Sequence, residues 1–302
     1  MKIEGIIPAV VTPFDKDENL DLGALKVIIG RLLEAGVHGI FVVGSTGEFW
    51  ALSPEEKRRI FEAAVETVAG KVPVYAGTCA NSTAETVLLS KEAESAGCDF
   101  VSVLTPSFIK PSDEELYLHY KAVVDAIKIP AILYSNPART NILLSTSLVR
   151  RLARDFEQVA GIKDSSGDLT QTAEYINNTP EKFSVIAGRD TLIFATLMMG
   201  GPAAIAATSN IVPEIVVGIY ENFSQGNLDE ARKLQRQLAP LRLAFSLGSF
   251  PSVIKEAAEL KGLPAGPCRR PIGPLTPENR EKLKNILQRM EVEIKKTEEK
   301  RD

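Results

Sequence analysis

The residue with the most distinctive chemical setting is Lys163, which ends a short apolar run in the stretch Gly161-Ile-Lys-Asp-Ser-Ser-Gly-Asp168. Alternation along a strand sends Val159, Gly161 and Lys163 to one face, and the glycine leaves space beneath the lysine stem. Burial disfavours the ammonium form and lowers the pKa of such a lysine, which then attacks a ketone and forms a Schiff base. The alternative is a lysine that keeps its ammonium in water at the strand end. Position alone does not decide between the two.

The segment Gly44-Ser-Thr-Gly-Glu48 is a candidate binding loop. Its backbone N–H groups and the hydroxyls of Ser45 and Thr46 are donors suited to a carboxylate. The same segment also fits an ordinary connection between a strand and a helix. Glu48 would repel an anion if it faced the same way, so we expect its side chain to hold the loop in place.

Tyr134 and Arg139 follow another apolar run, in the stretch YSNPART. The Tyr134 phenol can pass a proton between a substrate and solvent, although a tyrosine at a strand end is often only the polar edge of a core. Arg139 can fork onto a carboxylate, or lie in a surface loop without a partner.

Eight short β-branched runs alternate with helical patterns, which is typical of strands buried on both faces in a parallel sheet. Eight such units within about 225 residues favour a closed (β/α)8 TIM barrel over an open sheet. The active site of such a barrel lies at the carboxyl ends of its strands, where the residues named above stand. The predicted strands are 5–12, 39–44, 73–78, 100–105, 131–136, 159–164, 183–188 and 203–208.

The pattern becomes purely helical in the last quarter of the chain. We therefore predict a catalytic barrel over residues 1–225 and a helical region over residues 226–302. The capping sequence Ser53-Pro-Glu-Glu56 predicts a helix that begins at residue 54.

Several classes of function are disfavoured by composition. A net charge of −4 gives no electrostatic case for nucleic-acid binding. The two histidines, His38 and His119, lack a second ligand at zinc spacing, so we expect no metal of that kind. The three cysteines have no paired spacing and no apolar run is long enough for a membrane span, so we expect a cytoplasmic protein with reduced thiols.

One known family resembles this chain in a set of six short stretches that occur in the same order. They are PAVVTPF, GSTGE, YSNPART, GIKDSSGD, AGRD and CRRPIGPL. It is the superfamily of dihydrodipicolinate synthase and N-acetylneuraminate lyase, the pyruvate-dependent Schiff-base aldolases. The resemblance covers nearly the whole chain. It implies a (β/α)8 barrel with C-terminal helices and commonly a homotetramer built as a dimer of dimers. Our own expectation is a lyase that uses no cofactor and no metal.

The resemblance also implies roles for individual residues. Lys163 would form the Schiff base with pyruvate, and Tyr134 would act as general acid and base. Substrate binding would fall to four residues: Ser45 and Thr46 for the pyruvate carboxylate, Arg139 for the carboxylate of the aldehyde, and Ile205 through a backbone carbonyl that faces pyruvate.

The chain departs from the family pattern at several positions. Ser107 and Phe108 stand where two aromatic residues are expected, the second being a tyrosine that enters the neighbouring subunit's site and completes a proton relay. The family's asparagine after the tyrosine is Ser135, and a glycine is Asn141. At the lysine-feedback site of some synthases, Asn81 and Glu85 match, whereas Trp50, Pro54, Lys57 and Ser107 differ.

We therefore expect a pyruvate-dependent Schiff-base aldolase that resembles 4-hydroxy-tetrahydrodipicolinate synthase and condenses pyruvate with aspartate semialdehyde. Arg139 favours this substrate and Phe108 opposes it. A 2-keto-3-deoxy sugar acid aldolase, or a related 2-keto acid lyase or dehydratase, is the alternative substrate class. A barrel that binds a keto acid without turnover is the alternative of another kind.

Overall fold

Eight strands form one parallel sheet in the computed structural model, which describes residues 3–298 and the side chains of residues 3–290. The strands are β1 (Gly5–Pro8), β2 (Ile40–Val42), β3 (Val74–Gly77), β4 (Phe100–Leu104), β5 (Ala131–Ser135), β6 (Val159–Asp164), β7 (Ser184–Ala187) and β8 (Ala203–Ala206). They pair in the order β1-β8-β7-β6-β5-β4-β3-β2, and Ala9 bridges Phe41 to close the ring. The predicted (β/α)8 barrel is confirmed.

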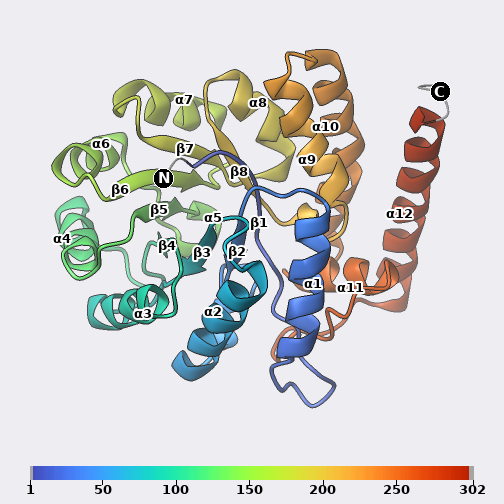
Figure 1. Cartoon of the computed structure of the whole chain (residues 1–302), viewed down its shortest axis with the longest axis horizontal. Helices are drawn as coiled ribbons and strands as arrows, with labels where there is room; N and C mark the ends of the chain where they lie inside the picture. The colour runs from blue at the N-terminus through green and yellow to red at the C-terminus, as the bar shows by residue number, and fades with distance from the viewer. Residues whose placement is uncertain (1–2, 299–302) are drawn as a thin grey trace.

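Helices follow the strands and surround the ring (Figure 1). The helices of the barrel are α1 (Leu22–Glu34), α2 (Pro54–Val68), α3 (Thr83–Ser95), α4 (Asp113–Val124), α5 (Pro137–Thr140), α6 (Thr146–Asp155), α7 (Leu169–Asn178), α8 (Ile193–Met198) and α9 (Pro213–Ser224). Short 3₁₀ turns lie at η1 (Phe49–Ala51), η2 (Asp190–Leu192) and η3 (Thr208–Asn210).

The start of α2 shows how the sequence sets a helix boundary. The Ser53 hydroxyl accepts a hydrogen bond from the Glu56 N–H at 3.2 Å, and the Glu56 carboxylate accepts one from the Ser53 N–H at 2.9 Å. Pro54 occupies the first helical position, where no N–H is needed. The predicted capping box is confirmed.

Apolar side chains fall into two layers because successive strand residues point to opposite faces. One layer fills the barrel interior and includes a stacked pair, Tyr75 and Phe100, with ring centroids 4.6 Å apart. The other layer packs the outward-facing strand residues against the helices. The interior of the barrel is therefore filled by side chains and is not an open channel.

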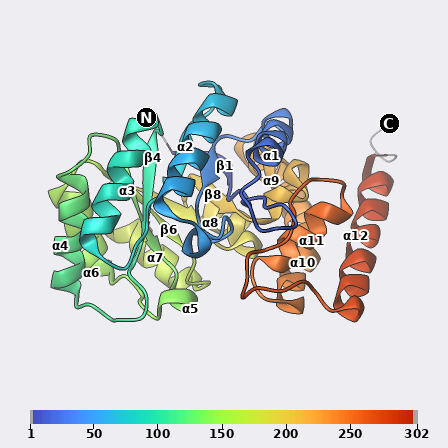
Figure 2. The same ribbon diagram turned by 90° about the horizontal axis from the view of Figure 1, so that it is seen from below.

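The C-terminal helices stand together on one side of the barrel in both views (Figures 1 and 2). They are α10 (Leu228–Leu243), η4 (Ala244–Leu247), α11 (Ser252–Leu260) and α12 (Pro277–Glu298). Leu238 and Leu241 of α10 are buried in the outer layer of the barrel core. The predicted division at residue 225 falls in the loop between α9 and α10, and residues 299–302 of the second region lie outside the described residues.

Arg269, in the segment after α11, joins the C-terminal region to α2. One guanidinium nitrogen donates to the Glu56 carboxylate at 2.8 Å and also to the Ala51 carbonyl at 2.7 Å. The hydrogen bond from Arg269, together with that from Ser53, outweighs burial and lowers the pKa of Glu56 to about 2.

This shift predicts how stability depends on pH. A carboxyl whose pKa is about 2 in the folded state and 4.5 as its ordinary value stabilises the fold above pH 4.5, and the contribution is lost as pH falls toward 2. Urea unfolding over this range should therefore show a smaller pH dependence for Glu56→Gln than for the unchanged protein. An equal dependence in both proteins would contradict the assignment.

Two kinds of feature are absent from the described residues, a membrane-spanning helix and a metal-binding cluster. No described helix is long and apolar enough to cross a membrane. Within residues 3–290, the histidine, cysteine and acidic side chains form no group of three or more that is able to hold a metal ion.

Candidate active site

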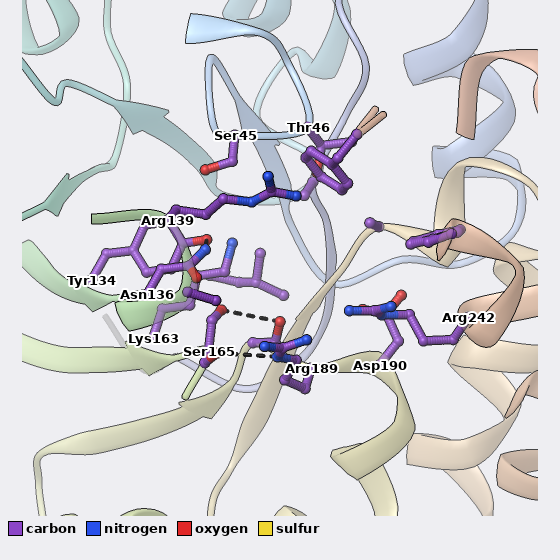
Figure 3. A pocket seen from close by; sticks show the side chains of 17 residues that line it. Ser45, Thr46, Tyr134, Asn136, Arg139, Lys163, Ser165, Arg189, Asp190 and Arg242 are labelled. Atoms are coloured by element: carbon purple, nitrogen blue, oxygen red, sulfur yellow. Dashed lines mark hydrogen bonds between the residues drawn. The ribbon is translucent and has the colours of Figure 1, made fainter. Parts of the chain in front are cut away.

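Polar side chains from the carboxyl ends of the strands meet in one cavity of about 150 Å³ (Figure 3). All six residues predicted for the site line it, namely Ser45, Thr46, Tyr134, Arg139, Lys163 and Ile205. They come from the segments that follow β2 and β5 and from β5, β6 and β8 themselves. Residues more than 150 positions apart in the chain are thus brought together by the barrel alone.

Lys163 lies inside the barrel, with 4% of its surface exposed. Its Nζ is 4.3 Å from the centroid of the Tyr134 ring and 4.9 Å from that of Phe41. No carboxylate among the described residues forms an ion pair with this amine. The adjacent Asp164 is held by other groups, since its carboxylate accepts hydrogen bonds from the Thr172 hydroxyl at 2.7 Å and the Ser166 N–H at 2.9 Å.

A β-bulge in β6 sets which side chains face inward. Ala131 pairs with Val159 but Ile132 pairs with Gly161, so Ala160 is the extra residue. Val159 consequently packs in the outer layer and Ala160 against the inner one, and the prediction that Val159 shares a face with Lys163 is wrong. The bulge was not visible in the sequence because alternation assumes an uninterrupted strand.

Gly161 serves a different purpose from the one predicted. A Cβ at this position would collide with the Ser184 carbonyl oxygen of β7. The glycine therefore permits β6 and β7 to approach closely, directly before Lys163, and thereby helps to fix where the lysine stem begins.

Tyr134 is the direct neighbour of Lys163 across the β5–β6 pairing. The Asn136 amide donates to its hydroxyl at 3.0 Å. Burial raises the pKa of the Tyr134 phenol, but the charge on Lys163 and hydrogen bonding with Ser165, Ser45 and Asn136 outweigh it, so the pKa is lowered from its usual value. The phenol thus gives up its proton more readily than an ordinary tyrosine.

The GSTGE loop is anchored on both sides. The Thr12 hydroxyl donates to the Gly47 carbonyl at 2.7 Å, and a Cβ at Gly44 would strike the Phe41 ring. Glu48 is fully buried and does not line the cavity. As expected, its carboxylate holds the loop: it accepts hydrogen bonds from Lys255 Nζ at 2.8 Å and from the Arg269 N–H at 3.0 Å.

Lys255, on α11, is the buried partner of Glu48. Its Nζ also donates to the Pro267 carbonyl at 2.6 Å and lies 4.4 Å from the centroid of the Phe14 ring. Burial lowers the pKa of Lys255, while Glu48 acts in the opposite direction. The CRRPIGPL stretch therefore belongs to the support of the GSTGE loop.

Several cavity residues were not predicted to be part of the site. Asn136 and Ser165 lie two positions after Tyr134 and Lys163, and the signal available in the sequence was that both side chains form hydrogen bonds. Arg189 and Asp190 stand in the AGRD stretch. The C-terminal residues Arg242, Phe245 and Phe250 also line the cavity, and no pattern in the sequence placed them there.

Phe108 lies outside the cavity, at the tip of the loop after β4. Its side chain is fully exposed, and its φ of 76° is in the left-handed region that non-glycine residues rarely adopt. The preceding Ser107 is fixed to Asn81, whose side-chain oxygen accepts hydrogen bonds from the Ser107 N–H and hydroxyl at 3.0 and 2.9 Å.

The model of the dihydrodipicolinate synthetase family matches residues 2–290. The chain belongs to this family. The 4-hydroxy-tetrahydrodipicolinate synthase of Methanopyrus kandleri is 39% identical to it over 296 residues, which cover 98% of this chain and 96% of the relative. The predicted family and enzyme class, a pyruvate Schiff-base lyase, are thereby confirmed.

Solved structures of the dihydrodipicolinate synthetase family share the fold over nearly all of their length. The 4-hydroxy-tetrahydrodipicolinate synthase of Methylacidiphilum fumariolicum SolV superposes with a TM-score of 0.95 at 32% identity, and the match covers 99% of each chain. YagE, a prophage protein of E. coli K12 in complex with pyruvate, gives 0.93 at 34% identity and covers 96% of this chain and 99% of its own.

Proposed function

We propose that the protein condenses pyruvate with aspartate semialdehyde through a Schiff base on Lys163, as a 4-hydroxy-tetrahydrodipicolinate synthase. The observation that carries this proposal is the Lys163 amine. It is buried next to Tyr134 inside the cavity that the Ser45–Thr46 loop borders, and no carboxylate of residues 3–290 pairs with it. The similarity to named synthases over nearly the whole chain supports the same substrate pair.

The proposed chemistry uses each predicted residue. The neutral amine of Lys163 attacks the ketone carbon of pyruvate, and loss of water leaves an iminium ion. The iminium is an electron sink, so C3 loses a proton and becomes the nucleophilic carbon of an enamine. This carbon attacks the aldehyde, and water then releases the product and restores the amine. Tyr134 carries the protons, Ser45, Thr46 and Ile205 orient pyruvate, and Arg139 binds the carboxylate of the aldehyde.

Borohydride reduction in the presence of pyruvate tests the central step. We expect intact mass to rise by one reduced pyruvate adduct, and peptide mapping to place it on Lys163. Rates with pyruvate and aspartate semialdehyde, compared with cleavage of 2-keto-3-deoxygluconate, then separate the two substrate classes. An absent adduct, or one on another lysine, refutes the proposal. An adduct without turnover of either substrate supports a barrel that only binds keto acids.

Tyr134→Phe should lower kcat by about a hundredfold, because general acid–base catalysis by one side chain typically contributes at least this factor. The ring that contacts Lys163 stays in place, so the slow formation of the pyruvate adduct should remain detectable. Tyr117→Phe on the surface helix α4 is the matched control, since it also removes one phenol hydroxyl. A kcat for Tyr134→Phe equal to that of this control would remove Tyr134 from the mechanism.

We also propose that the protein is a homotetramer built as a dimer of dimers. Phe108 and the half-exposed Ile109 form an apolar loop tip, and a second copy of the chain would cover it. Sedimentation of the intact protein measures the oligomeric state, and Phe108→Ser should weaken the contact. A monomer at micromolar concentration would contradict the proposal.

L-lysine should not inhibit the enzyme. The buried Lys57 stands at a position that corresponds to the lysine-feedback site of some synthases, and it already places an amine there. Burial lowers the pKa of Lys57, and attraction to Glu85 opposes that shift. A second ammonium there would be repelled. Initial rates should stay constant from micromolar to low-millimolar L-lysine, and inhibition within that range would show that the site is intact.

A further inference from the structure

Three arginines line the cavity above Lys163. Arg139 belongs to α5, Arg189 precedes η2, and Arg242 stands near the end of α10. Figure 3 shows their side chains entering the cavity from different sides. Only the first of them was anticipated as a substrate ligand.

None of the three guanidinium groups forms an ion pair with a carboxylate of residues 3–290. Arg139 lies over the Phe250 ring and Arg242 over the Phe245 ring, each 5.0 Å from the ring centroid. Arg189 donates from Nε to the Ser165 carbonyl at 3.1 Å. These contacts restrain the planar groups but leave their terminal N–H donors available, which is the arrangement that suits a bidentate anion.

The charge in the cavity is unbalanced. Among the side chains that the structure describes, Asp190 is the only carboxylate in the cavity lining, so three arginines against one acid leave a surplus of two positive charges, with Lys163 not counted. The Asp190 carboxylate is 3% exposed and accepts a hydrogen bond from the Thr208 N–H at 2.7 Å. Burial lowers the pKa of Arg242, Asp190 opposes this, and Arg189 and Arg139 lower it further by repulsion. A bound anion would relieve that repulsion.

We propose that Arg189 and Arg242 form a second anion site, separate from the Ser45–Thr46 loop, which selects aldehydes that carry an acidic group. The site rests on the proposed function, because its ligand is the compound that the enamine attacks. It deepens that function by stating a substrate class: acidic aldehydes are used, and neutral ones such as glyceraldehyde are rejected. This also disfavours 2-keto-3-deoxygluconate, whose cleavage gives a neutral aldehyde.

The first experiment needs no variant. With pyruvate saturating, kcat/KM is measured for four aldehydes: aspartate semialdehyde, succinate semialdehyde, glyceraldehyde 3-phosphate and glyceraldehyde. We expect the semialdehydes to exceed glyceraldehyde by at least about a hundredfold, the effect of losing charge-assisted hydrogen bonds to two arginines. The kcat/KM for glyceraldehyde 3-phosphate shows whether the site binds only a carboxylate or any compact anion. Equal values for acidic and neutral aldehydes overturn the inference.

The second experiment removes one guanidinium. Arg242→Met should lower kcat/KM for the acidic aldehydes by about 10- to 100-fold and leave the KM for pyruvate and the rate with glyceraldehyde unchanged. Arg242→Lys, which keeps the charge, should recover part of the loss. Arg236→Met on the exposed face of the same helix is the matched control and should behave as the unchanged protein.

The outcomes separate this inference from the proposed function. Borohydride trapping with pyruvate alone depends on Lys163 and not on the arginines, so an adduct without preference for acidic aldehydes refutes only the second anion site. An equal loss for acidic and neutral aldehydes in Arg242→Met would show that Arg242 only stabilises the fold of α10, and would also refute it. No adduct at all refutes the Schiff-base mechanism itself.

Discussion

Lys163→Met should abolish turnover, with a fall in kcat on the order of 10⁴-fold or more, the size of loss seen when a covalent nucleophile is removed. Methionine keeps most of the apolar stem between Phe41 and Tyr134 but has no amine to attack a ketone. Intact mass after borohydride reduction with pyruvate should show no adduct. Methionine places no polar or charged group at this buried position, so we expect the folded state to be retained.

The matched control for this variant is an exposed lysine. Lys91→Met on the surface of α3 should leave both the adduct and kcat unchanged. Residual activity in Lys163→Met within a factor of about ten of the unchanged protein would exclude covalent catalysis by this residue. A lost adduct with retained turnover would point to a reaction that does not pass through the trapped imine.

The barrel was predictable because its signals are local. Each strand is a short apolar run buried on both faces. Helix boundaries such as the one at Ser53–Glu56 are set by residues that are close together in the sequence. The parallel topology then carries the carboxyl ends of all strands to one end of the barrel. Tyr134 and Lys163 could therefore be placed together from sequence, and their register in the sheet bears this out.

The remaining features depend on contacts between distant segments. The bulge at Ala160 is a shift in the register between β5 and β6. The alternation of side chains within β6 alone does not predict it. Arg242 and Phe250 reach the cavity only because the C-terminal helices fold back onto the barrel. Helical periodicity states which residues share a face of α10 but not which element that face meets.

The buried ion pair between Glu48 and Lys255 gives the largest expected effect on stability. Both side chains are almost completely inaccessible, with 0% and 2% of their surfaces exposed, and they join the GSTGE loop to α11. Removing one member leaves the other charge buried without compensation, which typically costs about 3 to 5 kcal/mol. Glu48→Gln and Lys255→Met should each lower the free energy of unfolding in urea by about this amount.

The double variant Glu48→Gln/Lys255→Met tests why the single variants lose stability. The loss comes either from the charge left buried without a partner or from the lost ion pair itself. The double variant buries no lone charge, so its loss of stability should be well below the sum of the two single losses. Lys26→Met removes an exposed pair with Glu66 at 2.7 Å and should change stability by less than about 1 kcal/mol. Additive losses in the double variant would contradict coupling between Glu48 and Lys255.

The same variants test whether the pair positions the substrate loop as well as stabilising the fold. Ser45 and Thr46 lie three and two residues before Glu48, so a loop freed by Glu48→Gln should bind the pyruvate carboxylate less well. We expect the KM for pyruvate to rise while the KM for the aldehyde changes little, because the arginines stand on other elements. A variant that is destabilised but keeps its KM for pyruvate would show that Thr12 alone suffices to hold the loop, through its bond to the Gly47 carbonyl.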